Sequence, residues 1–394
     1  MRGVLDGGGI RRAPGRVPPM TAEAPFGVYV HIPFCRFRCD YCAFATYTDR
    51  DHLMEAYAAA CIAEIDRARL DEGMEPATSV FFGGGTPSRL PADLLVGILE
   101  ATPRAPGAEV TVECNPEDAH PDRLAAYRAA GVTRVSLGVQ STVPHVLAGL
   151  GRRHGADEAM DAAVVVAEAG FASWNMDLIL GGHGESDADW ERSLGDVISL
   201  NAPPPHLSAY ALTVEPGTPL AGRSERHPDD DIQAGRYERT DRILGQAGYH
   251  WEEISNWARP GHECRHNGLY WEQGDYRGIG SAAHSHRAGR RWWNVRTPDR
   301  YVKEVARGHR PTAGEEVLTP EQRRFESLAL RLRTPSGVPS DALADDADLD
   351  GLVERVDGRA VLTVRGRLLA NSVTTRLTGG AGARGPAGTI PPYA

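Results

Sequence analysis

The chain lacks several features that would assign it to a class at once. No run of about 18 apolar residues occurs in its 394 residues, so the sequence predicts no transmembrane helix. Residues 1–20 lack the apolar centre of a signal peptide. Lysine is nearly missing, since Lys303 is the only one, and a net charge of −10 does not favour a nucleic-acid-binding surface. The six cysteines, three clustered and three scattered, do not resemble the disulfide framework of a small secreted protein, so we expect a cytoplasmic protein.

Three of the six cysteines lie within eight residues. Cys35, Cys39 and Cys42 form a C-x3-C-x2-C pattern. Thiolates bind the irons of iron–sulfur clusters, and three thiolates leave one iron of a four-iron cluster open. A zinc site usually needs a second C-x2-C pair or a Cys/His quartet, and no second pair follows. Three neighbouring core cysteines with no role would be a coincidence, so the pattern predicts a cluster with one open iron.

From residue 27 onward, short β-rich runs alternate with longer helical runs. The expected strands are 28–32, 79–82, 109–113, 134–139, 173–179 and 206–212. The expected helices are 51–69, 91–100, 122–130, 157–168 and 187–200. This order predicts an α/β fold whose parallel strands and crossover helices form a partial (β/α)6 barrel. A helical run at 321–332 and a strand–turn–helix pattern at 359–377 predict a smaller α+β C-terminal domain.

Changes in composition and pattern along the sequence divide the chain into five parts. We expect disordered tails at 1–24 and at the Gly/Ala/Pro-rich 379–394, with Met20 as an alternative start. The barrel is expected at 25–220, an extension rich in His, Gly and aromatic residues at 221–315, and a winged-helix-like domain at 316–378.

Polar and glycine residues stand where the expected strands end. Gly83-Gly84-Gly85-Thr86 follows the second strand, Glu113 and Gln140 end the third and fourth, and Asp177 lies late in the fifth. The carboxyl ends of such strands carry the functional groups of βα barrels. Taken one at a time, these residues have simpler explanations. The glycines could form only a tight turn, and each charged residue could be solvated or paired in a salt bridge. Together with Arg152, which could bind a carboxylate, they describe a pocket for a zwitterionic, ribose-bearing molecule such as S-adenosylmethionine.

Six motifs in fixed order now give the chain a family resemblance. They are Tyr29-Val-His-Ile-Pro-Phe-Cys35, Gly83-Gly-Gly-Thr-Pro-Ser88, Glu113-Cys-Asn-Pro116, Val135-Ser-Leu-Gly-Val-Gln-Ser141, Gly151-Arg-Arg-His154 and Asn175-Met-Asp-Leu-Ile179. Over about residues 26 to 377 the chain resembles the radical S-adenosylmethionine superfamily, in the branch of oxygen-independent coproporphyrinogen oxidase and its relatives. Leu180-Gly-Gly-His-Gly-Glu185 departs from the family's Gly-Leu-Pro-Gly, which could alter the loop after the fifth strand.

The resemblance implies cofactors and their residues. Cys35, Cys39 and Cys42 would hold a [4Fe–4S] cluster. The S-adenosylmethionine pocket would be lined by Tyr29, Gly84, Gly85, Thr86, Glu113, Gln140, Arg152 and Asp177, with a backbone contact from Ala211.

Two branches of this family differ in function. The oxidases carry a further cysteine two residues after the third cluster ligand, and this chain has Phe44 there. His266-Asn-Gly-Leu-Tyr-Trp271 resembles the heme-binding motif of the heme-chaperone branch, with His266 as axial ligand, although a turn leading into a buried aromatic pair would look the same. His262, His284 and His286 could compete as ligands.

The resemblance therefore implies a heme chaperone that passes heme to an unidentified acceptor protein, with peripheral contact to membrane heme proteins as one route. The alternative is a radical oxidoreductase acting on a porphyrinogen.

Overall fold

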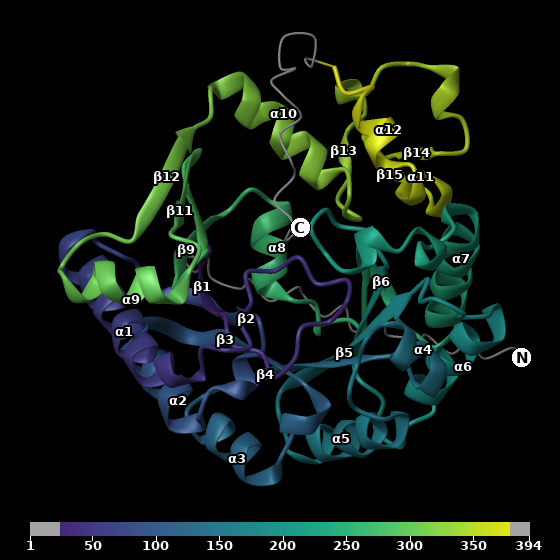
Figure 1. Cartoon of the computed structure of the whole chain (residues 1–394). Coiled ribbons are helices and arrows are strands. Elements are labelled where there is room, and N and C mark those ends of the chain that lie inside the picture. Colours follow the sequence, from purple (N-terminus) through teal and green to yellow (C-terminus); the bar gives the residue numbers. More distant parts are fainter. Residues whose placement is uncertain (1–23, 379–394) are drawn as a thin grey trace, which may run out of the picture.

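Six parallel strands form the centre of the structure, a computed structural model that describes residues 24–378. The expected tails at 1–24 and 379–394 lie outside the described residues, except for Ala24. The strands follow one another in chain order across the sheet, as β1 (Phe26–Ile32), β2 (Ala77–Gly84), β3 (Arg104–Cys114), β4 (Arg134–Gln140), β5 (Ser173–Leu180) and β6 (His206–Ala211). The expected partial barrel is confirmed (Figure 1).

Helices cover the outer face of these strands. They are α1 (Met54–Asp71), α2 (Ala92–Ala101), α3 (Pro121–Ala129), α4 (Pro144–Gly149), α5 (Ala156–Glu168) and α6 (Asp187–Ile198). Val30, Val80, Phe82 and Val112 are fully buried and belong to one apolar core that continues into the helices. The short α4 is not predicted from the sequence, because its six residues, which begin with a proline and end with a glycine, are too few to show a helical period.

The segment after β6 adds strands to both edges of the same sheet. At the β6 edge, β8 (Asn256–Ala258) and β7 (His250–Glu253) pair antiparallel after helix α7 (Asp230–Gln246). At the other edge, β9 (Asp275–Ile279) pairs parallel with β1. Beyond β9 come β10 (His284–Arg287), β11 (Arg290–Asn294) and β12 (Thr312–Val317), with helices α8 (Arg265–Trp271) and α9 (Pro298–Ala306) between the strands. The sheet therefore has 12 strands, and β1 lies well inside it.

The C-terminal part has a sheet and a core of its own. Helix α10 (Pro320–Arg331) leads from β12 to the sheet of β13 (Val338–Pro339), β14 (Val353–Val356) and β15 (Arg359–Leu362), and α11 (Val364–Leu368) and α12 (Ala370–Thr374) follow (Figure 1). Leu332, Val338 and Val373 are completely buried in its core. The smaller α+β domain is thus confirmed. Across residues 24–378 no helix combines the length and the apolar character that crossing a bilayer would require.

Candidate functional site

The three motif cysteines lie on the loop that follows β1. Cys35 is buried, and Cys39 and Cys42 are half-buried. The Cys35 N–H donates to the carbonyl of Tyr47 at 3.0 Å, and the Thr86 hydroxyl donates to the Cys35 thiol at 3.5 Å. The end of β2 therefore holds the first cysteine in place, as expected for a site built at strand ends.

The donor set of three cysteine thiols is of the kind that binds the irons of an iron–sulfur cluster. Within residues 24–378 no three His, Cys, Asp or Glu side chains are close enough together to hold one ion. In a four-iron cluster each thiolate binds a different iron. Burial raises the pKa of Cys35 to about 12 and also raises that of Cys42, so binding iron must displace the thiol protons.

The glycines after β2 are required by the packing of the cluster loop. Gly84 has φ +110°, and a Cβ there would lie 2.4 Å from the ring of His31. A Cβ on Gly85 would lie 2.9 Å from the carbonyl oxygens of Ile32 and Phe34 and 3.0 Å from the Cys35 sulfur. Glycine at these two positions therefore lets the end of β2 approach the loop that carries Cys35, Cys39 and Cys42 (the cluster loop). This packing requirement holds whether or not the glycines also contact a ligand.

His31 lies beside the cluster loop and is not among the site residues predicted from the sequence. Its ring is completely buried, with Nε2 3.0 Å from the Ala45 carbonyl oxygen and Nδ1 3.1 Å from the Tyr29 hydroxyl. Burial lowers the pKa of His31 to about 4, so the ring is neutral. The spacing of His31 from Tyr29 could have indicated that the two side chains lie on the same face of β1, since residues two apart in a strand share a face.

Two carboxyls on β3 and β5, those of Glu113 and Asp177, are close enough to interact electrostatically. Burial, and then the nearby Asp177, raise the pKa of Glu113 to about 8. Asp177 accepts hydrogen bonds from the Ser136 hydroxyl at 3.0 Å and the Asn175 amide at 2.7 Å, yet burial still raises its pKa. Both residues are half-buried. The ionised form of such a pair is stabilised when a cation binds near it or when hydroxyl groups donate hydrogen bonds to it. An ammonium group and ribose hydroxyls are ligand groups of these two kinds.

Arg152 connects the cluster loop to the barrel. One guanidinium nitrogen donates to the Cys39 sulfur at 3.4 Å, and another donates to Asn115 Oδ1 at 2.8 Å and the Gly138 carbonyl at 3.0 Å. Neighbouring Gln140 ends β4 with φ +69°, a conformation uncommon for a residue with a side chain and typical of functional sites. The role of Asn115 in orienting Arg152 could not be predicted, because it depends on the tertiary placement of β3.

The structure thus places most of the predicted S-adenosylmethionine residues at or near the carboxyl ends of the barrel strands, and His266 lies apart from them on α8. Ala211, at the end of β6, is exposed. Phe44 is 42% exposed on the cluster loop. The predicted ligand contacts of these residues stay predictions.

His266 lies deeper in the barrel, on α8, and is completely buried. Its Nδ1 is 2.9 Å from the Ser79 hydroxyl and its Nε2 is 2.9 Å from the Tyr270 hydroxyl. Its ring stacks on Phe81, and burial lowers its pKa to about 3. Glu109 fixes the start of α8 by accepting from the backbone N–H of His266 at 3.1 Å. In this conformation both ring nitrogens of His266 have hydrogen-bond partners within the protein.

A series of aromatic rings connects β1, which leads into the cluster loop, with His266 and Tyr270 on α8. Tyr29 lies 6.0 Å from His31 and 6.4 Å from Phe81, measured between ring centroids, and Phe81 lies 5.4 Å from His266. Beyond His266 come Tyr270 and Tyr276, at 5.2 and then 4.7 Å. A continuous series of ring contacts therefore runs from β1 to α8 and β9.

Comparison with known proteins assigns the family. The Radical SAM superfamily matches residues 29–197. The chain is 43% identical to the heme chaperone HemW of Mycobacterium tuberculosis, over 94% of this chain and 99% of that protein. It is 42% identical to HemW of Escherichia coli, over 67% of this chain and 71% of that protein. The solved structure of the coproporphyrinogen III oxidase HemN from Escherichia coli covers 90% of both chains, with a TM-score of 0.77 and 26% identity. This chain therefore belongs to the HemW family within the radical S-adenosylmethionine superfamily.

Proposed function

We propose that this protein is a heme chaperone, which binds heme and passes it to an acceptor protein. The observation that carries the proposal is the similarity to the HemW of Mycobacterium tuberculosis over nearly the whole chain. That similarity extends well beyond the barrel, whereas a likeness of the barrel alone would support only the fold. Cytoplasmic localisation, an unidentified acceptor protein and peripheral contact with membrane heme proteins are further parts of the proposal.

The strand-end site is proposed to bind a [4Fe–4S] cluster and S-adenosylmethionine. Cys35, Cys39 and Cys42 would hold the cluster, which supplies an electron and one open iron when bound. Glu113 and Asp177 would accept from the ammonium group and the ribose of S-adenosylmethionine, because a cationic or hydrogen-donating partner would stabilise the ionised carboxylates that burial disfavours.

Arg152 would bind the carboxylate of S-adenosylmethionine while keeping its contact with Cys39. Arg152 would then contact both the cluster ligand Cys39 and S-adenosylmethionine, since its guanidinium carries donors on more than one nitrogen. Tyr29, Gly84, Gly85, Thr86 and Gln140 are proposed to line the same pocket.

The motif on α8 is proposed to serve heme binding. His266 is its expected iron ligand, but in the conformation described only Tyr270 of the hydrogen-bonded pair reaches solvent. Ligation by His266 would require the rings around it to move apart.

A porphyrinogen oxidoreductase is the second candidate, favoured by the structural likeness to HemN. Phe44 argues against it, because the oxidases carry a cysteine at this position and a phenyl ring can neither ligate iron nor donate a hydrogen atom as a thiol does.

The test is anaerobic incubation of the cluster-reconstituted protein with heme and, separately, with coproporphyrinogen III. We expect one heme retained per chain, released to an added apo-globin, and no oxidised porphyrinogen. Formation of protoporphyrinogen in proportion to cluster content, and loss of that product in Cys39→Ala, would replace the chaperone by the oxidase.

A further inference from the structure

A series of hydrogen-bonded polar side chains runs from the strand-end site to the start of α8. It begins at Asp177, which accepts from the Asn175 amide at 2.7 Å. The oxygen of that amide lies 2.5 Å from Nδ1 of His206 on β6, and Nε2 of His206 lies 2.8 Å from Glu252 on β7. The second oxygen of Glu252 accepts from the backbone N–H of Cys264, directly before α8, at 2.8 Å. Asn175, His206 and Cys264 are buried, so water does not compete for these contacts.

The orientation of Asn175 ties Asp177 to His206. Its amide nitrogen faces Asp177 and the hydroxyls of Ser136 and Ser208, so its oxygen is turned towards His206. Turning the amide round would set its oxygen against the Asp177 carboxyl. Nδ1 of His206 must therefore donate, because an amide oxygen only accepts.

His206 and Glu252 hold one proton between them. Nδ1 of the ring donates to Asn175 and Nε2 faces a carboxyl, so a hydrogen bond at Nε2 needs a further proton on one of the two groups. Burial lowers the pKa of His206 to about 4, which favours a neutral ring. Burial opposes the charge of Glu252 as well, yet the hydrogen bond from His206 lowers the pKa of Glu252 overall. The proton therefore belongs to the pair, and removing either side chain breaks the series.

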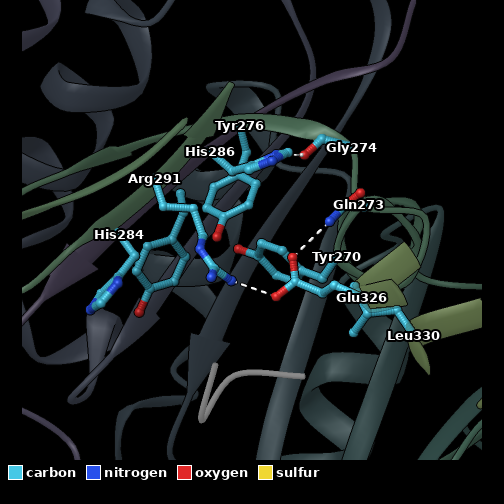
Figure 2. Close-up of a pocket in the computed structure, with 10 residues that line it drawn as sticks. Tyr270, Gln273, Gly274, Tyr276, His284, His286, Arg291, Glu326 and Leu330 are labelled. Atoms are coloured by element: carbon cyan, nitrogen blue, oxygen red, sulfur yellow. Dashed lines mark hydrogen bonds and ion pairs between the residues drawn. The ribbon is translucent and has the colours of Figure 1, made fainter. Parts of the chain in front are cut away.

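Carboxyl oxygens hold the start of α8. Besides Glu252, Glu109 of β3 accepts from the first two backbone N–H groups of the helix, at 3.2 and 3.1 Å. At the other end of α8, Tyr270 lines a pocket together with Tyr276 of β9 and Leu330 of α10 (Figure 2). The start of α8 is thus fixed by direct hydrogen bonds, whereas open space adjoins its end.

We propose that His206 and Glu252 are positioning residues that couple the S-adenosylmethionine site to α8. A ligand that donates to Asp177 fixes the Asn175 amide, and the series carries this order to the backbone before α8. The proposal rests on the proposed S-adenosylmethionine site and adds a form of regulation to it.

Ligand binding acts on the first contact of the series. Burial raises the pKa of Asp177, so without a ligand its protonated form is favoured more than in water. Ribose hydroxyls would stabilise the ionised carboxylate, which accepts more strongly from Asn175. Asn175 then holds its oxygen more firmly towards His206. Because such coupling is reciprocal, breaking the series should also weaken S-adenosylmethionine binding.

The test is amide hydrogen exchange of the cluster-reconstituted full chain, measured by mass spectrometry on peptides that cover residues 262–272. In wild type, saturating S-adenosylmethionine should slow exchange at the start of α8 roughly fivefold or more. Glu252→Ala and His206→Phe should bind S-adenosylmethionine more weakly and, once saturated, should show no such slowing, because each breaks the series.

Glu252→Gln separates the hydrogen bonds from the bulk of the side chain. Its amide can donate to a neutral His206 and accept from the Cys264 N–H, so the series stays complete and the slowing should be kept. His227→Gln is the matched control, because His227 is half-buried, contacts the Leu220 carbonyl and lies outside the series. This variant should behave as wild type.

The outcomes separate this coupling from the cofactor site itself. If calorimetry detects no S-adenosylmethionine binding to wild type, the proposed cofactor site is refuted. If wild type binds S-adenosylmethionine without a change at α8, or if Glu252→Ala shows the same slowing as wild type, the coupling is refuted and the cofactor site stands. Loss of the slowing in Glu252→Gln, with fold and cluster intact, would also overturn the coupling.

Discussion

Replacing Glu113 by glutamine should stabilise the cofactor-free protein increasingly as the pH rises. The pKa of Glu113 is raised from 4.5 to about 8, so its protonated form is favoured by the fold. The stability that comes from this raised pKa is fully present below pH 4.5 and is lost as the pH rises towards about 8, because the unfolded chain releases the proton and the folded chain keeps it. Glutamine has a similar shape and does not titrate.

The size of the effect follows from the pKa difference. One pKa unit corresponds to about 1.4 kcal/mol, so the full slope between pH 5 and pH 7 would give about 2.7 kcal/mol. Glu113 is half-buried, and solvent screening reduces this to about 2 kcal/mol. We therefore expect the advantage of Glu113→Gln over wild type to grow by about 2 kcal/mol across this range, or a few degrees in Tm.

The assay is thermal unfolding of both proteins at pH 5, 6, 7 and 8 without cluster or S-adenosylmethionine. Glu55→Gln, on the exposed face of α1, is the matched control and should shift Tm equally at every pH. Adding S-adenosylmethionine should stabilise wild type and stabilise Glu113→Gln less, since a ligand stabilises the state that binds it. A difference in Tm that does not change with pH, or that shrinks from pH 5 to pH 7, would refute the reasoning about Glu113.

Three other predictions concern the same site. Cys39→Ala should abolish the brown colour and the reducible iron–sulfur signal in absorption and electron paramagnetic resonance spectra, while Cys264→Ala should keep both; the opposite pattern would overturn the cluster assignment. Gly85→Ala should lower the iron content measured after reconstitution, because its methyl group would lie 3.0 Å from the first motif thiol, whereas Gly97→Ala, whose nearest neighbour would be 3.8 Å away, should leave it unchanged. Arg152→Gln should weaken S-adenosylmethionine binding roughly tenfold to a hundredfold in calorimetry, and an unchanged affinity would place the carboxylate elsewhere.

Most barrel strands could be predicted from the sequence because they contain apolar and β-branched residues bounded by turn residues. Strand β4 is an example, expected at 134–139 and found at Arg134–Gln140. The extension strands carry no such pattern. His284–Arg287 and Thr312–Val317 contain almost no aliphatic residues, and they form strands because neighbouring chain segments supply hydrogen-bond partners.

The candidate site was predictable to a similar extent. Residues in short motifs, such as the cysteines and Glu113, could be identified from the sequence and the family resemblance. Contacts across the fold could not. The hydrogen bond from Arg152 to Cys39, and the burial of His266 behind Tyr270, depend on how distant strands and α8 pack together.

The position of β1 has a consequence for how the protein is made. This strand carries the cluster loop at its end and lies between β2 and β9, with Phe26 paired to Asp275. A ribosome finishes β2 early, but β9 only after most of the chain has been synthesised. Until then one side of β1 is an unpaired edge, the kind of surface that invites aggregation. We expect cluster delivery to a nascent chain to precede closure of this edge, so a ribosome-bound fragment ending before β9 should depend on chaperones that shield exposed strands.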